Sequence, residues 1–291
     1  MAKHKSASGL IWSTQKLDRK PFGGNRETVK FAHIKQLPES GLFAAEVASQ
    51  DPDIQAVAIS LEGYAVDFTG IESMPRLSEL LIHNCEGILP YSGAPAGTLN
   101  LKRVIMPYAG GVTEQFLASP PLQDVEVDGG PLDMLQDLSG SARKVTLRRV
   151  KSASRHTDWG MLGQVEEFEI VQSGKIEVLP PRDRWPQFVN FTLVSALEGI
   201  VQASKIQPFR GVAFNGVRAM DPTASIWDLQ ANCVYFDFDF NARPPKWLIE
   251  AWDDRPKDWA DVFRVPEHRL LPGSEDQDWE RNGNGYIEHE A

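Results

Sequence analysis

The side chains in this sequence that could bind a metal or attack a substrate do not form a recognisable catalytic pattern. None of the six histidines has a second histidine or a Cys-x-x-Cys at metal-ligand spacing: His4, His33, His83, His156, His268 and His289. The sequence RHTD at residues 155–158 resembles a catalytic fragment only by chance, and no Gly-x-Ser-x-Gly elbow is present. The Gly-Gly pairs at 23–24 and 110–111 lack a phosphate-loop motif. We therefore expect a protein that is not an enzyme, with no cofactor and no metal site.

Two further groups of residues have chemical potential. Asp237 and Asp239 alternate in the sequence VYFDFDF, so in a strand both carboxylates would lie on one face. They could hold a cation or a basic side chain, or they could be charges that block edge-to-edge pairing of the last strand, which we favour. Cys85 and Cys233 are the only thiols, and two cysteines make no disulfide framework.

A spaced apolar pattern recurs along most of the chain and would position these residues. It is clearest in residues 77–85, LSELLIHNC, where Leu77, Leu80 and Ile82 stand at offsets 0, 3 and 5 of a unit. Units in the same phase begin at residues 26, 54, 77, 101, 122, 142, 165, 186, 209 and 231. Offsets 3 and 5 alternate as in a half-buried strand. Between the strands, short helical segments are expected at 42–50, 113–119, 131–138, 195–203 and 225–230. The sequence therefore predicts an α/β repeat protein.

This pattern resembles the leucine-rich repeats, whose consensus is Leu-x-x-Leu-x-Leu-x-x-Asn/Cys-x-Leu, over roughly residues 26–240. The resemblance implies a solenoid of about ten strand and short-helix units with a parallel, exposed and concave sheet that binds partners. Cys85 occupies the ninth position of the clearest unit. Elsewhere that position departs from the consensus, as in a divergent and irregular member: Glu62, Ala109, Gly130, Val150, Ser173, Val194, Val217 and Asp239. With seven steps between their units, Cys85 and Cys233 are expected on the order of 30 Å apart, as free thiols.

The same phase predicts which side chains face outward. Residues at offsets 0, 3 and 5 should be buried, and those at offsets 2, 4 and 6 should form the exposed face, beginning with Thr28, Lys30 and Ala32. The candidate binding residues are Leu81, His83, Arg103, Asp124, Glu126, Asp128, Lys144, Arg148, Glu167, Glu169, Tyr235 and Asp237. Apolar groups are expected at both ends of this face: Leu81, Ile105, Pro107 and Tyr108 at one end, and Phe188, Tyr235 and Phe238 at the other.

The central rows of this face alternate in charge, and two explanations stay open. Opposite charges on neighbouring strands stabilise a sheet by roughly 0.2 to 1 kcal/mol per pair. Alternatively, the charges form a docking patch centred on the five residues Asp124, Glu126, Asp128, Lys144 and Arg148, with Arg149 beside it. Both explanations can hold together.

Composition limits the class of partner. The formal net charge of −10 argues against a general nucleic-acid binder, which needs a cationic surface, and favours a basic partner. Hydrophobic and charged contents of 42% and 24% are those of a folded protein. No membrane span or signal-peptide core is found, so we expect no membrane association and a cytoplasmic location.

These observations divide the chain into four parts. Residues 1–25 are expected to be a flexible arm or an N-terminal cap, 26–240 the solenoid, 241–272 an aromatic C-terminal cap, and 273–291 an acidic tail. The favoured function is a protein-interaction scaffold that binds another protein on the sheet face; a specific form is a bacterial immunity or regulatory protein that neutralises a basic partner. The alternatives are an enzyme with an unrecognised site, and an adaptor that acts through its terminal segments.

Overall fold

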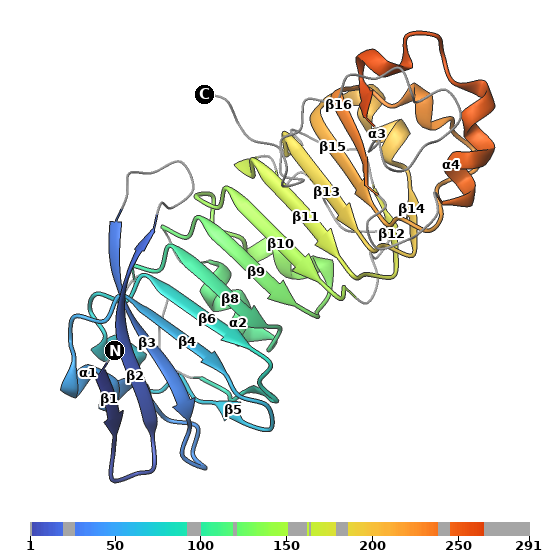
Figure 1. Cartoon of the computed structure of the whole chain (residues 1–291). Helices are drawn as coiled ribbons and strands as arrows, with labels where there is room; N and C mark the ends of the chain where they lie inside the picture. The colour runs from blue at the N-terminus through green and yellow to red at the C-terminus, as the bar shows by residue number, and fades with distance from the viewer. Residues whose placement is uncertain are drawn as a thin grey trace. The chain divides into compact units, whose positions relative to one another are not determined.

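The computed structural model describes residues 2–19, 27–91, 100–118, 121–150, 162, 164–178, 186–237 and 245–264. The chain divides into an N-terminal unit, Met1–Arg148, and a C-terminal unit, Arg149–Ala291. Both are built on the same α/β plan of mostly parallel strands joined by short helices (Figure 1). Among the described residues the main sheet has thirteen strands, eight of them in the N-terminal unit and five in the C-terminal unit.

The N-terminal unit begins with an antiparallel hairpin and continues with parallel strands. The strands β1, β2 and β3 pair antiparallel, and every later pair is parallel. The strand order is β1 (Ala2–Lys5), β2 (Ile11–Arg19), β3 (Glu27–Gln36), β4 (Ala56–Ser60), β6 (Glu79–His83), β8 (Arg103–Pro107), β9 (Asp124–Asp128) and β10 (Lys144–Arg148). Two strands thus precede Glu27, where the sequence pattern predicted none.

The sheet of the C-terminal unit is entirely parallel in its described pairings. Its order is β11 (Glu167–Val171), β13 (Phe188–Thr192), β15 (Phe209–Asn215), β16 (Ala231–Asp237) and β17 (Phe263–Arg264). Two smaller parallel ladders run beside the main sheet, one in each unit: β5 (Ala65–Val66) with β7 (Gly87–Ile88), and β12 (Lys175–Glu177) with β14 (Ala196–Glu198).

The predicted register of the strands is confirmed within each unit, except at the first copy of the pattern. The offset-3 residues pair across neighbouring strands: Val57 with Leu80, Leu80 with Val104, Val104 with Val125, Val125 with Val145, Phe168 with Val189, Val189 with Val212, and Val212 with Val234. Residues at offsets 3 and 5 of these units are buried, at most 1% exposed. Apolar spacing alone therefore predicted the strand register, because one slipped residue would turn each apolar set toward solvent.

The connections between strands are short helices. The helices are α1 (Ala44–Gln50), η1 (Ile71–Ser73), α2 (Gly111–Leu117) and η2 (Leu132–Asp137) in the N-terminal unit, and α3 (Ile200–Ile206) and η4 (Ile226–Asp228) in the C-terminal unit. Figure 1 shows α1 and α2 behind the N-terminal sheet. All five expected helical segments overlap a helix, although 131–138 and 225–230 adopt 3-10 turns, and 195–203 begins with the strand β14 and ends before α3 does.

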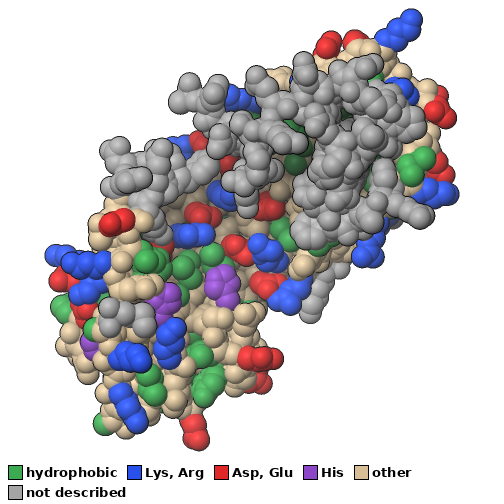
Figure 2. All heavy atoms as spheres, viewed as in Figure 1, with side chains coloured by type: hydrophobic (Ala, Val, Ile, Leu, Met, Phe, Trp, Pro, Cys, Tyr) green, Lys and Arg blue, Asp and Glu red, His purple; other side chains and the backbone are tan. Residues whose placement is uncertain are grey.

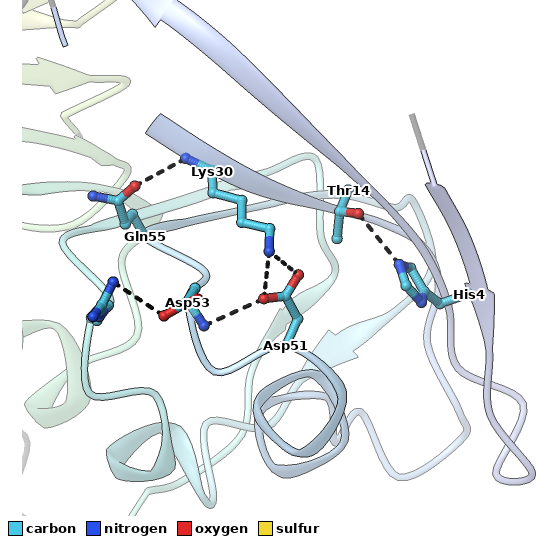
Figure 3. Close-up of polar contacts among 7 residues, drawn as sticks. His4, Thr14, Lys30, Asp51, Asp53 and Gln55 are labelled. Carbon is cyan, nitrogen blue, oxygen red and sulfur yellow. Dashed lines mark hydrogen bonds and ion pairs between the residues drawn. The ribbon is translucent and has the colours of Figure 1, made fainter. Parts of the chain in front are cut away.

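The first copy of the repeat is the exception, because its two faces are exchanged. Ala32, rather than Val29, pairs with Val57, an offset of three residues. Since side chains alternate along a strand, an odd offset reverses every residue of β3. Lys30, which the repeat phase placed on the exposed face, instead turns toward α1 and forms an ion pair with Asp51, Nζ to Oδ2 at 2.6 Å (Figure 3). Ala32 is fully buried, so the prediction that Thr28, Lys30 and Ala32 face outward was wrong.

A left-handed backbone residue ends most repeat strands. It stands at offset 7 of its unit. At Gly129, Arg149, Gln172 and Leu193 its N–H donates to a carbonyl of the next strand, as Gln172 does to Thr192 at 2.8 Å. The residues and their φ angles are Asn84 (50°), Arg149 (49°), Gln172 (49°), Leu193 (55°), Gly129 (84°) and Gly216 (66°). The left-handed region favours glycine, so the four side-chain-bearing residues carry local strain that tertiary packing holds in place.

Aromatic residues cover the end of the C-terminal sheet. After β16 come α4 (Lys246–Ala251), η5 (Trp252–Asp254) and η6 (Trp259–Asp261). The ring of Trp247 packs edge-on against Phe214 and Phe236, and Phe263 stacks on Phe236 at 5.8 Å. Of the predicted cap at 241–272, residues 245–264 are described; the acidic tail at 273–291 lies outside the described residues.

Candidate interaction surface

The outer face of the N-terminal unit is the side of its sheet opposite the buried offset-3 and offset-5 residues. Three rows of side chains cross it in register, one residue from each strand. One row holds Phe31, Ala56, Glu79, Arg103, Asp124 and Lys144, and the next holds His33, Ala58, Leu81, Ile105, Glu126 and Thr146. The third row has two parts, Ser60 with His83, and Pro107 with Asp128 and Arg148. Eight of the twelve predicted binding residues therefore lie on this face.

Charged residues on β8, β9 and β10 are paired with one another. Arg103 Nε lies 3.0 Å from Asp124 Oδ2, and Arg148 Nε donates to Glu126 Oε1. The contact between Arg103 Nε and Asp124 is an ion pair but not a hydrogen bond. The buried Arg103 Nε has no acceptor in hydrogen-bond geometry among the described residues. Lys144, opposite Asp124, has polar contacts of its own. The structure thus favours the ladder explanation for these charges.

Four residues that the sequence placed on this exposed face are buried: Ala56, Glu79, Ile105 and Thr146. Ile105 was predicted to belong to an exposed apolar group, but it is only 7% exposed, and Glu79 is 4% exposed. On the adjacent strands Glu79 lies opposite Arg103, and Ile105 lies opposite Leu81 and Glu126; strands about 4.8 Å apart bring such long side chains within reach of the next position. Leu81 is half-buried and His83 is exposed.

The reversed strand β3 brings residues that the sequence pattern assigned to the core onto the outer side of the sheet. Because β3 is reversed, Val29 and Phe31 lie on the outer side, but both are buried as predicted, at 3% and 6% exposure. They form an apolar cluster with Ala56, against which Leu81 packs. Leu17, opposite Val29 on β2, is 38% exposed. The signal that could have placed them is the alternation of Trp12, Thr14, Ala32 and Ile34, which fits two strands facing the core in the opposite phase.

Two histidines, His33 and His83, lie on this outer face. His33 stacks on Phe31 at 5.8 Å, and its Nε2 lies 2.7 Å from the side-chain amide nitrogen of Gln15. With that amide donating, Nε2 accepts and the ring proton is on Nδ1. Burial, and secondly the charge of Lys35, lower the pKa of His33. His83, the only histidine on the predicted face, is exposed on the third row. The sequence thus identified one histidine of the pair.

The C-terminal unit presents a different outer face. Glu169 Oε1 accepts a hydrogen bond from Asn190 Nδ2 at 3.0 Å, and Glu167 lies opposite Phe188. The guanidinium of Arg210 lies over the Phe188 ring, 5.5 Å from its centroid. Glu167 and Glu169 also have other contacts, so neither carboxylate is free.

Tyr235 is the exposed aromatic residue of this face, at 40% exposure. It lies opposite Ala213 and Arg264, with Cys233 two residues earlier on the same side. Burial and its contact with Cys233 raise the pKa of Tyr235. The backbone of Asp237 pairs with Asn215, whereas the side chain of Asp237 and the residues Phe238 and Asp239 lie outside what the structure describes.

Neither thiol is part of a reactive arrangement. Cys85 and Cys233 are free and half-buried. Cys85 donates to the backbone oxygen of His83 at 3.3 Å, and burial raises the pKa of its thiol. In the described ranges, no three His, Cys, Asp or Glu side chains gather in a way that could hold a metal ion. The described helices include none long and apolar enough to cross a membrane.

Comparisons with family models, with curated proteins and with solved structures find no match to this chain. The resemblance to leucine-rich repeats therefore stands on the apolar spacing of the sequence alone. The candidate surface has to be interpreted from its own residues.

Proposed function

We propose that this protein is a non-enzymatic scaffold that binds another protein on the outer face of its parallel sheet. The observation that supports this most directly is the division between the two faces of the N-terminal sheet. Helices pack on one face (Figure 1), while the other carries polar and apolar side chains (Figure 2) on strands that pair in register. A face of this kind offers many contacts at fixed spacing, as protein interfaces require.

The architecture that we propose for the whole chain is a divergent solenoid of the leucine-rich-repeat kind. The register of the offset-3 residues and the left-handed residue at offset 7 support a common unit. The internal ion pairs also fit a binding face, because paired charges are prearranged and lose little freedom when a partner covers them. Partner specificity would then come from the pattern of charges rather than from any single residue.

The test is a pull-down from a native extract with three immobilised proteins. The first is the wild type, the second carries Glu126→Lys with Arg148→Glu, and the third carries Lys175→Glu with Glu198→Lys. The last pair is a matched control, because Lys175 Nζ and Glu198 Oε2 form a 2.7 Å ion pair on the small ladder β12–β14, away from the main sheet. Each swap exchanges two charges and leaves the net charge unchanged.

We expect a protein that the wild type and the control retain and that the Glu126/Arg148 variant loses. Circular dichroism should show that both variants are folded. If every retained protein survived the swap on the outer face, the proposed docking surface would be wrong. Binding lost equally in both variants would point to a general electrostatic effect, and would also contradict the proposal.

A further inference from the structure

The outer face of the N-terminal unit is not uniform, because its charges are balanced at one end only. On β8 to β10 the basic and acidic residues form ion pairs with each other. On β1 to β6 the exposed cations Lys3, Lys5 and Lys35 make no ion pair with any described residue. This end of the face therefore carries uncompensated positive charge, although the whole chain is acidic.

Carboxylates on the same strands do not offset these lysines. Glu79 shares the face but is only 4% exposed. Glu27 lies at the far end of β3, opposite Arg19 in the strand register. At physiological ionic strength a charge is screened beyond about 8 Å, so the local lysines, rather than the net charge of the chain, decide which charge is attracted here.

An apolar surface lies beside the lysines. One row of the sheet runs from Lys3 through Ser13, His33 and Ala58 to Leu81, in the order β1, β2, β3, β4, β6. The basic side chains are at its start, and the half-buried Ala58 and Leu81 are at its end. Figure 2 shows hydrophobic side chains gathered next to histidines and basic residues on this part of the surface.

The length of this row sets the size of the occupant. Four strand spacings of about 4.8 Å separate Lys3 from Leu81, or roughly 19 Å. An extended peptide rises about 3.3 Å per residue, so about six residues span the row. Ser13, between Lys3 and His33 in the row, is only 2% exposed. The groups that face a ligand at the basic end are therefore donors: the lysine ammonium groups and the Nδ1–H of His33, whose Nε2 accepts from Gln15. Carboxylates are the side chains that accept from all of them.

We propose that the row from Lys3 to Leu81 binds an acidic peptide segment of a partner protein, with its carboxylates over β1 to β3 and an apolar side chain against Ala58 and Leu81. This inference rests on the proposed function and makes it more specific. The net charge of the chain alone favours a basic partner, whereas this row favours an acidic one. A nucleic acid would neutralise the lysines but would leave the apolar end of the row uncovered. The patch also has too few cations to hold a phosphate backbone.

The experiment uses the full chain and labelled eight-residue peptides in fluorescence anisotropy. The probe has three Glu at one end and Leu-Phe-Leu at the other; comparison peptides replace Glu by Lys, or the apolar residues by Ser. An oligothymidine of eight nucleotides is the nucleic-acid probe. The variant is Lys3→Glu with Lys5→Glu and Lys35→Glu. The control is Lys102→Glu, an exposed lysine that precedes β8 and makes no ion pair among the described residues.

We expect the Glu-Leu-Phe-Leu probe to bind the wild type and the control alike, and the triple variant about tenfold more weakly, with binding that falls as salt rises. Both comparison peptides should bind less tightly than the probe. The proposal is overturned if the probe does not bind, if the triple variant binds it as the wild type does, or if the Lys peptide or the oligothymidine binds at least as well. The two proposals can fail separately. If the Glu126/Arg148 variant loses its partner in the pull-down but any of these anisotropy outcomes is found, the proposed function stands and the acidic peptide is excluded.

Discussion

The hydroxyl of Ser173 accepts a hydrogen bond from the backbone N–H of Val150 at 3.1 Å and donates one to the carbonyl of Val171 at 3.0 Å. Ser173 occupies the ninth position of its unit, where leucine-rich repeats carry Asn or Cys. The serine therefore joins neighbouring turns from a position that departs from the consensus. At the same position of their units Val150 and Val194 are buried and apolar, so the ninth residue is polar in some units and apolar in others.

Ser173→Ala should destabilise the protein by about 1 to 3 kcal/mol, because the buried N–H of Val150 would lose its acceptor. Ser195→Ala is the control, since Ser195 is exposed and is expected to change stability by less than about 0.5 kcal/mol. Urea denaturation followed by circular dichroism measures both. Equal midpoints for the two variants would show that the Ser173 bond contributes nothing.

Gln172→Gly should stabilise the protein by about 1 kcal/mol. Gln172 is exposed and adopts a φ of 49°, a conformation that costs an L-residue roughly this amount and glycine very little. The matched control is Gln202→Gly, an exposed glutamine inside α3, where glycine should destabilise by about 0.5 to 1 kcal/mol. The same substitution is thus predicted to shift the thermal midpoint in opposite directions at the two sites, and shifts of the same sign would contradict the assigned backbone geometry.

Tyr91→Phe should make the protein less sensitive to alkaline pH. The Tyr91 hydroxyl donates to Glu72 Oε2 at 3.1 Å, and burial together with this carboxylate raises its pKa to about 12. The unfolded value is about 10. Because the folded pKa is higher, the stability from Tyr91 is fully present below pH 10 and is lost as pH rises from 10 through 12.

The measurement is the free energy of unfolding between pH 9 and pH 12. The free energy of unfolding of the wild type should fall more steeply with pH than that of Tyr91→Phe. The difference in slope should correspond to at most one proton per molecule. Glu72→Gln keeps the burial of Tyr91 but removes the charge, so its slope should lie between the other two. Parallel curves for all three proteins would be inconsistent with the raised pKa.

Lys30→Met tests the reversed first repeat. In the structure, Lys30 and Asp51 are 28% and 14% exposed, so removing the lysine leaves a partly buried carboxylate without its partner. We expect a loss of about 1.5 to 3 kcal/mol. For comparison, Glu126→Gln breaks a pair whose arginine is 38% exposed and should cost at most about 1 kcal/mol, and less at high salt. If Lys30→Met were the milder of the two, the side chain would not be directed toward α1.

The sequence by itself determined the strand register and the buried positions of the repeats from residue 54 onward. Apolar residues at offsets 3 and 5 are a local signal, because each strand must bury one of its two faces and neighbouring units share one spacing. The short helices followed from the same logic. Apolar spacing therefore predicted the rows of the outer face correctly, including the positions of Arg103, Asp124, Glu126 and Arg148.

Only the tertiary structure decided what the first repeat and the individual side chains do. Val29 and Phe31 have the spacing of a repeat strand, but pairing with β2 shifts β3 by three residues and turns them to the outer face. The alternation of side chains along a strand does not say which of its two faces is buried. Pairing with distant strands decides that. The burial of Glu79 and the diagonal pair of Arg148 with Glu126 likewise depend on side chains of neighbouring strands, whose reach sequence spacing does not specify.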